Sequence, residues 1–295
     1  MTLSRRRFLM ISASALALPN PGRASAEAAT WQGRALGADV RLQVVGLTRA
    51  ASARLWHRVE QTLAGVEARF SLYRLSELTR LNATGVLVNP SADMLDLITL
   101  SGTLNQTTNG AFDPTVQAIW QALAQGRDPE PARRAAGWHR VGIAPDRIRL
   151  TSGMALTFNG IAQGHAADRI AGLMRREGLR NVLIDAGEIV ALGQTDRQTP
   201  WRVGIAAADG APLATRALTD RALATSSPQA TRIGPAHSAH ILHPDGRSPL
   251  WRTVSVSAPD AALADGLSTA FCLMSREEID AALARHPEAR LEYLG

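Results

Sequence analysis

Residues 254–271 read VSVSAPDAALADGLSTAF, a short apolar alternation followed directly by an amphipathic pattern. The alternation predicts a strand, and the later apolar residues follow the i, i+4, i+7, i+8 spacing of a core-facing helix. Leu267 and Phe271 belong to that apolar face, whereas Asp265 and Thr269 lie one helical turn apart on the opposite face. Taken alone, the fragment indicates a strand and then an amphipathic helix with a solvated polar side.

Strand and helix patterns mix irregularly through the rest of the chain. Residues 38–46 alternate like a strand, residues 51–70 and 94–104 have helical periodicity, and residues 162–178 predict a helix that ends at Gly178. Further strands are expected at residues 181–193, 201–207 and 221–227. Because no regular βαβ alternation is present, these patterns favour an α+β fold in a single domain.

Three other segments predict turns and connections. The polar stretch SLYRLSELTRLN, residues 71–82, is expected as a turn. Residues 125–138 contain Gly, Pro and charged side chains and indicate a surface insertion. Residues 147–150 and 154–160 are expected to pair as a short hairpin.

The composition excludes a broad basic surface. The chain has 295 residues, 45% of them hydrophobic, which is enough for a sizeable core. Its formal net charge is +6, and all 32 basic residues are Arg. Setting aside the four Arg of residues 1–26, a segment without acids, leaves 28 Arg against 26 Asp and Glu. A body so close to neutral lacks the electrostatic footprint of a nucleic-acid-binding protein.

The N-terminal segment has the features of an export signal. SRRRFLM at residues 4–10 precedes an apolar run, and ASA at residues 24–26 supplies small residues for cleavage. This arrangement resembles a twin-arginine signal peptide over residues 1–26, followed by a mature domain at residues 27–295. The apolar run is too short to span a bilayer, so a periplasmic protein without a membrane span in its mature part is expected.

Two loops could carry chemistry, although each also has a structural explanation. Asp113 precedes Pro114 and is expected in a turn, where its carboxyl can bond to the backbone or to a ligand. Gly160 and Gly164 mark a strand-to-helix junction, where backbone groups can approach an anion or a cation. A glycine-containing junction is weak evidence by itself.

Seven segments, in their order along the chain, resemble the motifs of the ApbE family of FAD:protein FMN transferases. The matching segments are FSLYRLSELTRLN, TNGAFDPTV, NGIAQGHAAD, VLIDAGEIVALG, LATSS, HILHP and VSVSAPDAALADGLSTAF. They span the chain from about residue 35 to its end. Members of that family cleave FAD at its diphosphate and join the FMN phosphate to a Thr or Ser hydroxyl of a target protein.

The resemblance implies a Mg²⁺ site on the C-terminal helix. Asp265 and Thr269 match the family residues that give side-chain oxygens to the ion, and Gly160 matches the residue that gives its carbonyl. Mg²⁺ prefers oxygen ligands and commonly binds a carboxylate together with substrate phosphate. The family thus suggests a metal-binding role for the polar face of this helix.

The resemblance also implies which residues hold FAD, the substrate. The matching positions are Tyr73, Ala111, Phe112, Asp113 and Asp168. His240 matches a family His and is expected as the general base on the acceptor hydroxyl. From the residues alone, Tyr73 is also explained as a core side chain, Asp168 as a surface charge and His240 as a structural His.

Several family positions are changed in this chain. Thr157 replaces an Asp, Gln163 replaces a Lys, Ser227 replaces a Gly, and His243 replaces an Asp. Loss of the Lys removes a cation near the phosphates. The changes leave open an alternative function, a protein that binds or hydrolyses FAD without modifying a partner.

A second alternative sets the resemblance aside. His237, His240 and His243 recur at three-residue steps and would suit a periplasmic metal-binding module if they converged. On the strand expected there, successive members point to opposite faces and do not converge.

The expected function is therefore Mg²⁺-dependent transfer of FMN from FAD to a Thr or Ser hydroxyl, that is, covalent flavinylation. The family implies that the acceptor is a membrane-associated redox subunit with a short Ser/Thr-containing flavinylation motif.

Overall fold

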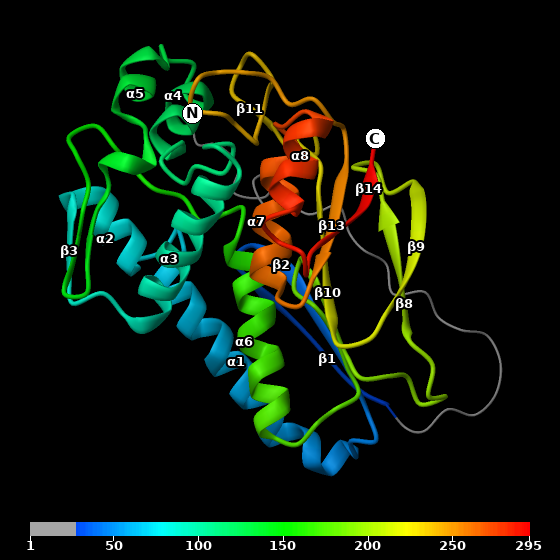
Figure 1. The fold of residues 1–295 in the computed structure, drawn as a ribbon. Coiled ribbons are helices and arrows are strands. Elements are labelled where there is room, and N and C mark those ends of the chain that lie inside the picture. Colours follow the sequence, from blue (N-terminus) through cyan, green and yellow to red (C-terminus); the bar gives the residue numbers. More distant parts are fainter. Residues whose placement is uncertain (1–27) are drawn as a thin grey trace.

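The computed structural model describes residues 28–295, so the predicted signal peptide at residues 1–26 lies outside the described part. At its centre is a seven-stranded antiparallel sheet (Figure 1). The strands follow one another across the sheet in the same order as along the chain. In that order they are β1 (Ala28–Ala35), β2 (Ala38–Val45), β6 (Val182–Asp185), β7 (Ile189–Leu192), β10 (Arg221–Ser226), β13 (Val254–Ala258) and β14 (Arg290–Leu294).

The period-two alternation of the strands gives this sheet two apolar faces. On one face Ile184 packs in the larger core beneath the helices. On the other face Leu183 and Ile189 pack against the hairpin of β8 (Trp201–Ala206) and β9 (Pro212–Leu218). The protein therefore has three layers: helices, main sheet and hairpin.

Three helices cover the first face of the sheet (Figure 1). They are α1 (Arg49–Phe70), α6 (Ala162–Arg176) and α7 (Ala261–Phe271). α6 packs against both α1 and α7, and α7 packs against β10 and β13. The predicted end of α6 is confirmed, since Gly178 follows it with a φ of 74° that an L side chain rarely adopts.

The segment between β2 and β6 folds largely outside the main sheet. In it β3 (Val86–Val88), β5 (Arg147–Arg149) and β4 (Gly142–Ala144) form a separate three-stranded sheet. Later in the chain, β11 (Arg232–Ile233) pairs with β12 (Ser238–Ala239). The remaining elements are α2 (Glu77–Thr84), α3 (Ala92–Thr107), α4 (Gln117–Ala124), α5 (Glu130–Ala135), a short 3₁₀ helix (Trp138–Arg140) and α8 (Arg276–Leu283).

Two local predictions are wrong. The polar stretch 71–82 is not simply a turn, because Ser76 and Thr79 form a reciprocal capping box that begins α2. Residues 154–160 do not pair with 147–150; β5 pairs instead with β4 and β3. The single α+β domain is confirmed.

The predicted solvated side of α7 is also wrong. Asp265 is 3% exposed and Ser268 and Cys272 are fully buried, although all three lie opposite the apolar face. Small residues permit this burial, since a Cβ on Gly266 would meet a Leu104 methyl group at 2.3 Å. The helix is therefore largely buried on both faces rather than solvated on its polar side.

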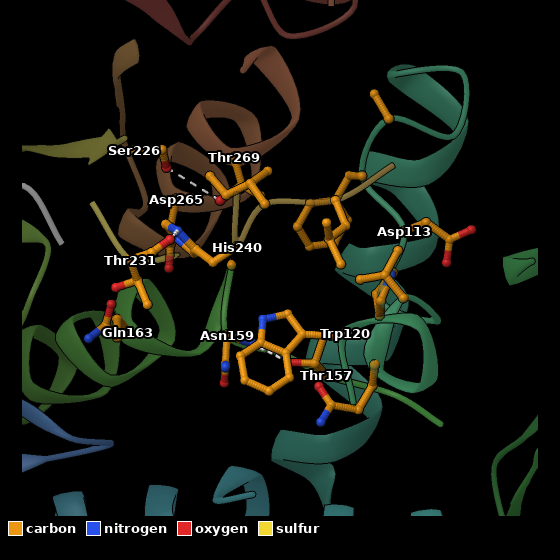
Figure 2. A pocket seen from close by; sticks show the side chains of 18 of the residues that line it. Asp113, Trp120, Thr157, Asn159, Gln163, Ser226, Thr231, His240, Asp265 and Thr269 are labelled. Carbon is orange, nitrogen blue, oxygen red and sulfur yellow. Dashed lines mark hydrogen bonds between the residues drawn. The ribbon is translucent and has the colours of Figure 1, made fainter. Parts of the chain in front are cut away.

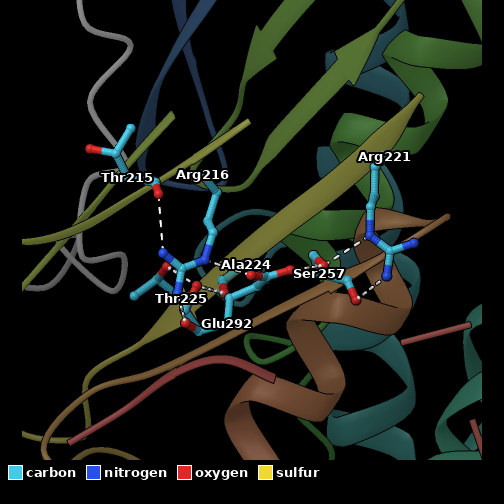
Figure 3. Close-up of polar contacts among 8 residues, drawn as sticks. Thr215, Arg216, Arg221, Ala224, Thr225, Ser257 and Glu292 are labelled. Carbon is cyan, nitrogen blue, oxygen red and sulfur yellow. Dashed lines mark hydrogen bonds and ion pairs between the residues drawn. The ribbon is translucent and has the colours of Figure 1, made fainter. Parts of the chain in front are cut away.

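A polar network joins β14 to its neighbours on the hairpin side (Figure 3). The Glu292 carboxylate accepts hydrogen bonds from Arg216 Nε at 2.6 Å and from Ser257 Oγ at 2.6 Å. Arg221 Nε donates to Ser257 Oγ at 2.9 Å. These bonds hold β14 against β13, the strand that leads into α7.

Among residues 28–295, no helix has both the length and the apolar character needed to cross a membrane.

Candidate active site

A pocket opens where the polar side of α7 meets the N-terminus of α6 and the start of α4 (Figure 2). Seven of the nine predicted site residues line it. They are Ala111, Phe112, Asp113, Gly160, His240, Asp265 and Thr269. In Figure 2 the last three lie on one side of the pocket and Asp113 lies on the opposite side. The fold thus brings together segments that are more than 100 residues apart in the sequence.

Asp265 projects from α7 toward the N-terminus of α6. Its Oδ2 accepts a hydrogen bond from the Gly164 amide at 3.1 Å. Burial raises the pKa of Asp265 to about 7, and the charge of Asp168 acts in the same direction. A carboxyl group in such surroundings gains much from a nearby cation.

Gly160 and Thr269 approach each other closely beside Asp265. A Cβ built on Gly160 would lie 2.9 Å from both Oγ1 and Cγ2 of Thr269, so a larger residue does not fit. Ser226 Oγ lies 2.7 Å from Ser268 Oγ and 3.4 Å from Thr269 Oγ1. Carboxylate and hydroxyl oxygens therefore gather beside Gly160 at one end of the pocket.

This donor set is one for a hard cation. Oxygen ligands of these types suit Mg²⁺, whereas imidazole and thiolate suit transition metals. Within residues 28–295 no three His, Cys, Asp or Glu side chains are grouped to hold a metal ion. The predicted ligands Asp265, Thr269 and Gly160 therefore fit Mg²⁺ and do not resemble a zinc or copper site.

His240 reaches the same pocket from the loop after β12. Its Nδ1 lies 3.2 Å from the Thr231 carbonyl oxygen. A carbonyl can only accept, so this contact places the proton on Nδ1 and leaves Nε2 as the acceptor. Burial lowers the pKa of His240, which favours the neutral ring that a general base requires.

The other two histidines do not converge with His240. His237 is exposed and adopts a φ of 52°, and His243 is buried with its Nδ1 2.6 Å from Asp245 Oδ1. Neither lines the pocket. The placement of these side chains gives no support to a three-histidine metal module.

Asp113 has the turn-forming role considered from its sequence. Its Oδ1 accepts from the Thr115 amide at 2.8 Å and from Thr115 Oγ1 at 2.6 Å, and its Oδ2 accepts from the Trp138 amide at 3.2 Å. These bonds fix the turn around Pro114. The residue also belongs to the pocket wall, so it shapes the wall through the turn.

Tyr73 and Asp168 do not line the pocket. Tyr73 is 59% exposed on the segment before α2. The Asp168 carboxylate accepts the amides of Ala261 at 2.8 Å and Ala262 at 2.9 Å. Asp168 is therefore neither a surface charge nor a pocket residue; it caps the N-terminus of α7 from α6.

Replacement of Asp168 by Asn is expected to lower the free energy of unfolding by about 2 kcal/mol, because an amide NH₂ cannot accept the second backbone N–H. Urea unfolding of D168N and of Asp260→Asn measures the difference. Asp260 is the exposed N-cap residue of the same helix and makes no side-chain capping bond. Equal stability of D168N and the wild type would contradict the capping role.

Of the changed family positions, two face the pocket and two do not. Thr157 and Gln163 are part of its wall. Ser227 is fully buried away from it and bonds to Thr253 Oγ1 at 3.0 Å. Ser227 and His243 therefore lie outside the pocket wall.

Sequence reasoning missed Trp120 and Glu188. Both line the pocket, Trp120 from α4 and Glu188 from the turn before β7. The periodicity of α4 identifies Trp120 only as one residue of a helix. Glu188 lies within VLIDAGEIVALG, one of the seven matching segments, and this position in a motif is the signal that could have identified it.

Comparisons with known proteins identify related sequences over most of the chain. A family model described as the ApbE family matches residues 36–293. FAD:protein FMN transferase of Klebsiella pneumoniae is 26% identical over 286 residues, covering 88% of this chain and 82% of that protein. The Salmonella typhimurium protein of the same name is 25% identical over 295 residues, covering 90% of this chain and 84% of that protein.

Solved structures share the fold. Flavin transferase ApbE from Vibrio cholerae superposes with a TM-score of 0.76 at 23% identity, over 88% of this chain and 92% of that chain. The ApbE protein from Thermotoga maritima gives a TM-score of 0.78 at 22% identity, over 90% and 93% of the two chains.

Proposed function

The chain belongs to the ApbE family of flavin transferases, and on that premise we propose that it catalyses Mg²⁺-dependent transfer of FMN from FAD to a Thr or Ser hydroxyl of a partner redox protein. The observation that carries the proposal is the meeting of Asp265, Thr269 and Gly160 with His240 in one pocket. A cation site and a neutral base are the two devices that this reaction needs.

In the proposed reaction the acceptor oxygen bonds to the phosphorus of the FMN phosphate. The P–O bond to the bridging diphosphate oxygen breaks, and AMP leaves with that oxygen and the bonding pair. His240 Nε2 takes the proton of the acceptor hydroxyl, which makes the oxygen nucleophilic. Mg²⁺ held by Asp265, Thr269 and the Gly160 carbonyl would neutralise negative charge on the diphosphate.

The remaining wall of the pocket suits a flat organic ligand. Phe112, Ala111 and Trp120 offer apolar surface beside the Asp113 turn. Thr157 and Gln163 provide neutral polar groups where the family has an acid and a cation. Within the pocket wall no Arg side chain replaces the missing Lys. Most of the positive charge at the phosphates would therefore come from the metal ion.

The acceptor proposed is a membrane-associated redox subunit that carries a short Ser/Thr flavinylation motif. The twin-arginine pattern of residues 1–26 supports a periplasmic location, in which this enzyme meets the exported part of such a subunit. Fusion of residues 1–26 to a reporter protein, expressed with and without the twin-arginine translocase, tests that location separately.

Intact-mass measurement of an acceptor domain tests the transfer. The purified protein is mixed with FAD, Mg²⁺ and a redox-subunit domain carrying the motif; the expected result is a mass gain equal to FMN less water. The gain should disappear with a chelator and with an acceptor whose motif Thr is replaced by Ala. Release of FMN and AMP without an adduct, across several motif-bearing acceptors, would identify a hydrolase instead.

A further inference from the structure

Glu188 is a buried acid that the proposed reaction does not use. It is 4% exposed and lines the same pocket as Asp265. Its Oε2 accepts the Thr225 amide of β10 at 3.1 Å. Among the hydrogen bonds of residues 28–295, Oε2 alone of its two carboxylate oxygens has a donor, so Oε1 is available to a ligand.

Glu188 and Asp265 are both buried and both line the wall of one pocket. Burial and then the negative charge of Asp265 raise the pKa of Glu188 well above its usual range. Each carboxyl accepts one backbone N–H, from Thr225 and from Gly164 respectively. Two such bonds do not offset two negative charges removed from water.

No protein cation balances this pair. Within residues 28–295 neither acid forms an ion pair with Arg or His, and the chain has no Lys at all. The charged side chains of the pocket wall are Asp113, Glu188 and Asp265, and His240 is its only other titratable group. Of the three acids, Asp113 is tied by bonds to Thr115 and Trp138, so the uncompensated charge lies at Glu188 and Asp265.

We infer that Glu188 belongs to the cation site, where its carboxylate and that of Asp265 share one divalent cation. The inference rests on the proposed function for the identity of the cation, Mg²⁺. It adds a second carboxylate, from the turn between β6 and β7, to the ligands from α7 and from the loop before α6. A doubly charged ion balances two carboxylates, which explains why neither has an Arg partner.

Glu188→Gln tests the contribution of the negative charge of Glu188 to cation binding. Gln can still accept the Thr225 amide through its side-chain oxygen and has nearly the same volume, so the fold is preserved while one negative charge is removed. Glu67→Gln is a matched control. Glu67 Oε1 also accepts a backbone amide, that of Leu36 at 3.1 Å, but Glu67 lies outside the pocket and pairs with Arg74.

The experiment is calorimetric titration of the purified protein with MgCl₂ in the absence of FAD. The dissociation constant of E188Q is expected to be at least about tenfold higher than that of the wild type, or about 1.4 kcal/mol, whereas E67Q is unchanged. In thermal unfolding with a chelator, E188Q should melt no lower than the wild type, and added Mg²⁺ should raise its melting temperature less. Glu188→Asp keeps the charge and should bind Mg²⁺ more tightly than E188Q.

Equal Mg²⁺ affinity of E188Q and a wild type that transfers FMN would overturn the inference and leave the proposed function intact. If E188Q does not fold, the comparison rests on E188D, whose shorter carboxylate should still change the Mg²⁺ affinity relative to E67Q; no change contradicts the inference. A wild type that neither binds Mg²⁺ nor transfers FMN would instead remove the proposed function and the inference with it.

Discussion

Asp265→Asn is expected to reduce Mg²⁺-dependent FMN transfer by on the order of 10³-fold while the protein stays folded. The side-chain oxygen of Asn can still accept the Gly164 amide, so the bond at 3.1 Å survives. What is lost is the negative charge that the proposed site offers to the cation. The transfer assay by intact mass measures the effect, with D260N as the control on the same helix.

The difference in unfolding free energy between the wild type and D265N should depend on pH. The pKa of Asp265 is raised in the folded protein to about 7 from a reference value of 3.8, so the folded state binds this proton more tightly than the unfolded state. The contribution of Asp265 to stability is therefore present below about pH 4 and is lost as the pH rises to about 7. Urea unfolding in chelator should show the wild type losing stability relative to D265N over that interval.

Two outcomes would contradict this account. Full Mg²⁺-dependent activity of D265N would exclude Asp265 as a ligand. A wild type and D265N whose unfolding free energies run parallel from pH 4 to pH 7 would show that the buried carboxyl ionises without cost.

Gly164→Ala is expected to destabilise the protein by about 3 kcal/mol, although Ala is the better helix former. A Cβ on Gly164 would lie 2.3 Å from the Ala261 carbonyl oxygen and 2.7 Å from the Ala262 Cα. These are backbone atoms of α7, whose N-terminus Asp168 holds in place. The added methyl group can be accommodated only if α6 and α7 move apart.

Gly172→Ala is the matched control on the same helix. Its Cβ would meet only the end of the flexible Arg176 side chain, at 3.4 Å, so a gain of about 0.5–1 kcal/mol is expected. Thermal and urea unfolding of the two variants should therefore change in opposite directions. A Gly164→Ala protein as stable as the wild type would mean that the two helices are not in the close contact described.

Separation of α6 from α7 should also weaken the cation site. The Gly164 amide is the donor that orients Asp265, so a shift of the helix moves the carboxylate. At a temperature where Gly164→Ala is still folded, its Mg²⁺ affinity should be lower than that of Gly172→Ala.

Periodicity predicts the strands and helices that bury one face and expose the other. The alternation of β2, the apolar face of α1 and the Gly178 end of α6 are local signals, and the structure confirms them. The polar side of α7 was misread because a helix with one apolar face usually exposes the other. Only the tertiary arrangement shows that Asp265 and Ser268 are buried.

The site shows a similar division. Motif matching selects seven residues that the structure places in one pocket, and it also selects Asp168, which accepts backbone amides at the start of α7. It does not single out Glu188, although this residue lies within the matching segment VLIDAGEIVALG, in the turn before β7. Position within a motif indicates that a residue is near the site. Its hydrogen-bond partners show whether its side chain faces the pocket or holds a neighbouring part of the backbone.

The chain-ordered main sheet has a consequence for how such a protein diverges. Because neighbouring strands are also successive, each segment between them leaves the sheet and returns beside its starting point. The cost of closing such a loop rises by only about 0.6 kcal/mol for each doubling of its length. Segments can therefore lengthen or change sequence without altering any strand pairing.

The pocket wall is assembled from several of these segments between strands. Gly160 comes from the one between β2 and β6, His240 from the one between β10 and β13, and Asp265 from the one between β13 and β14. Evolution can consequently remodel one portion of the wall, as at Gln163, while the others and the sheet stay as they are. The fold is shared with solved structures at 22–23% identity, which is consistent with strand pairings that tolerate change in the segments between them.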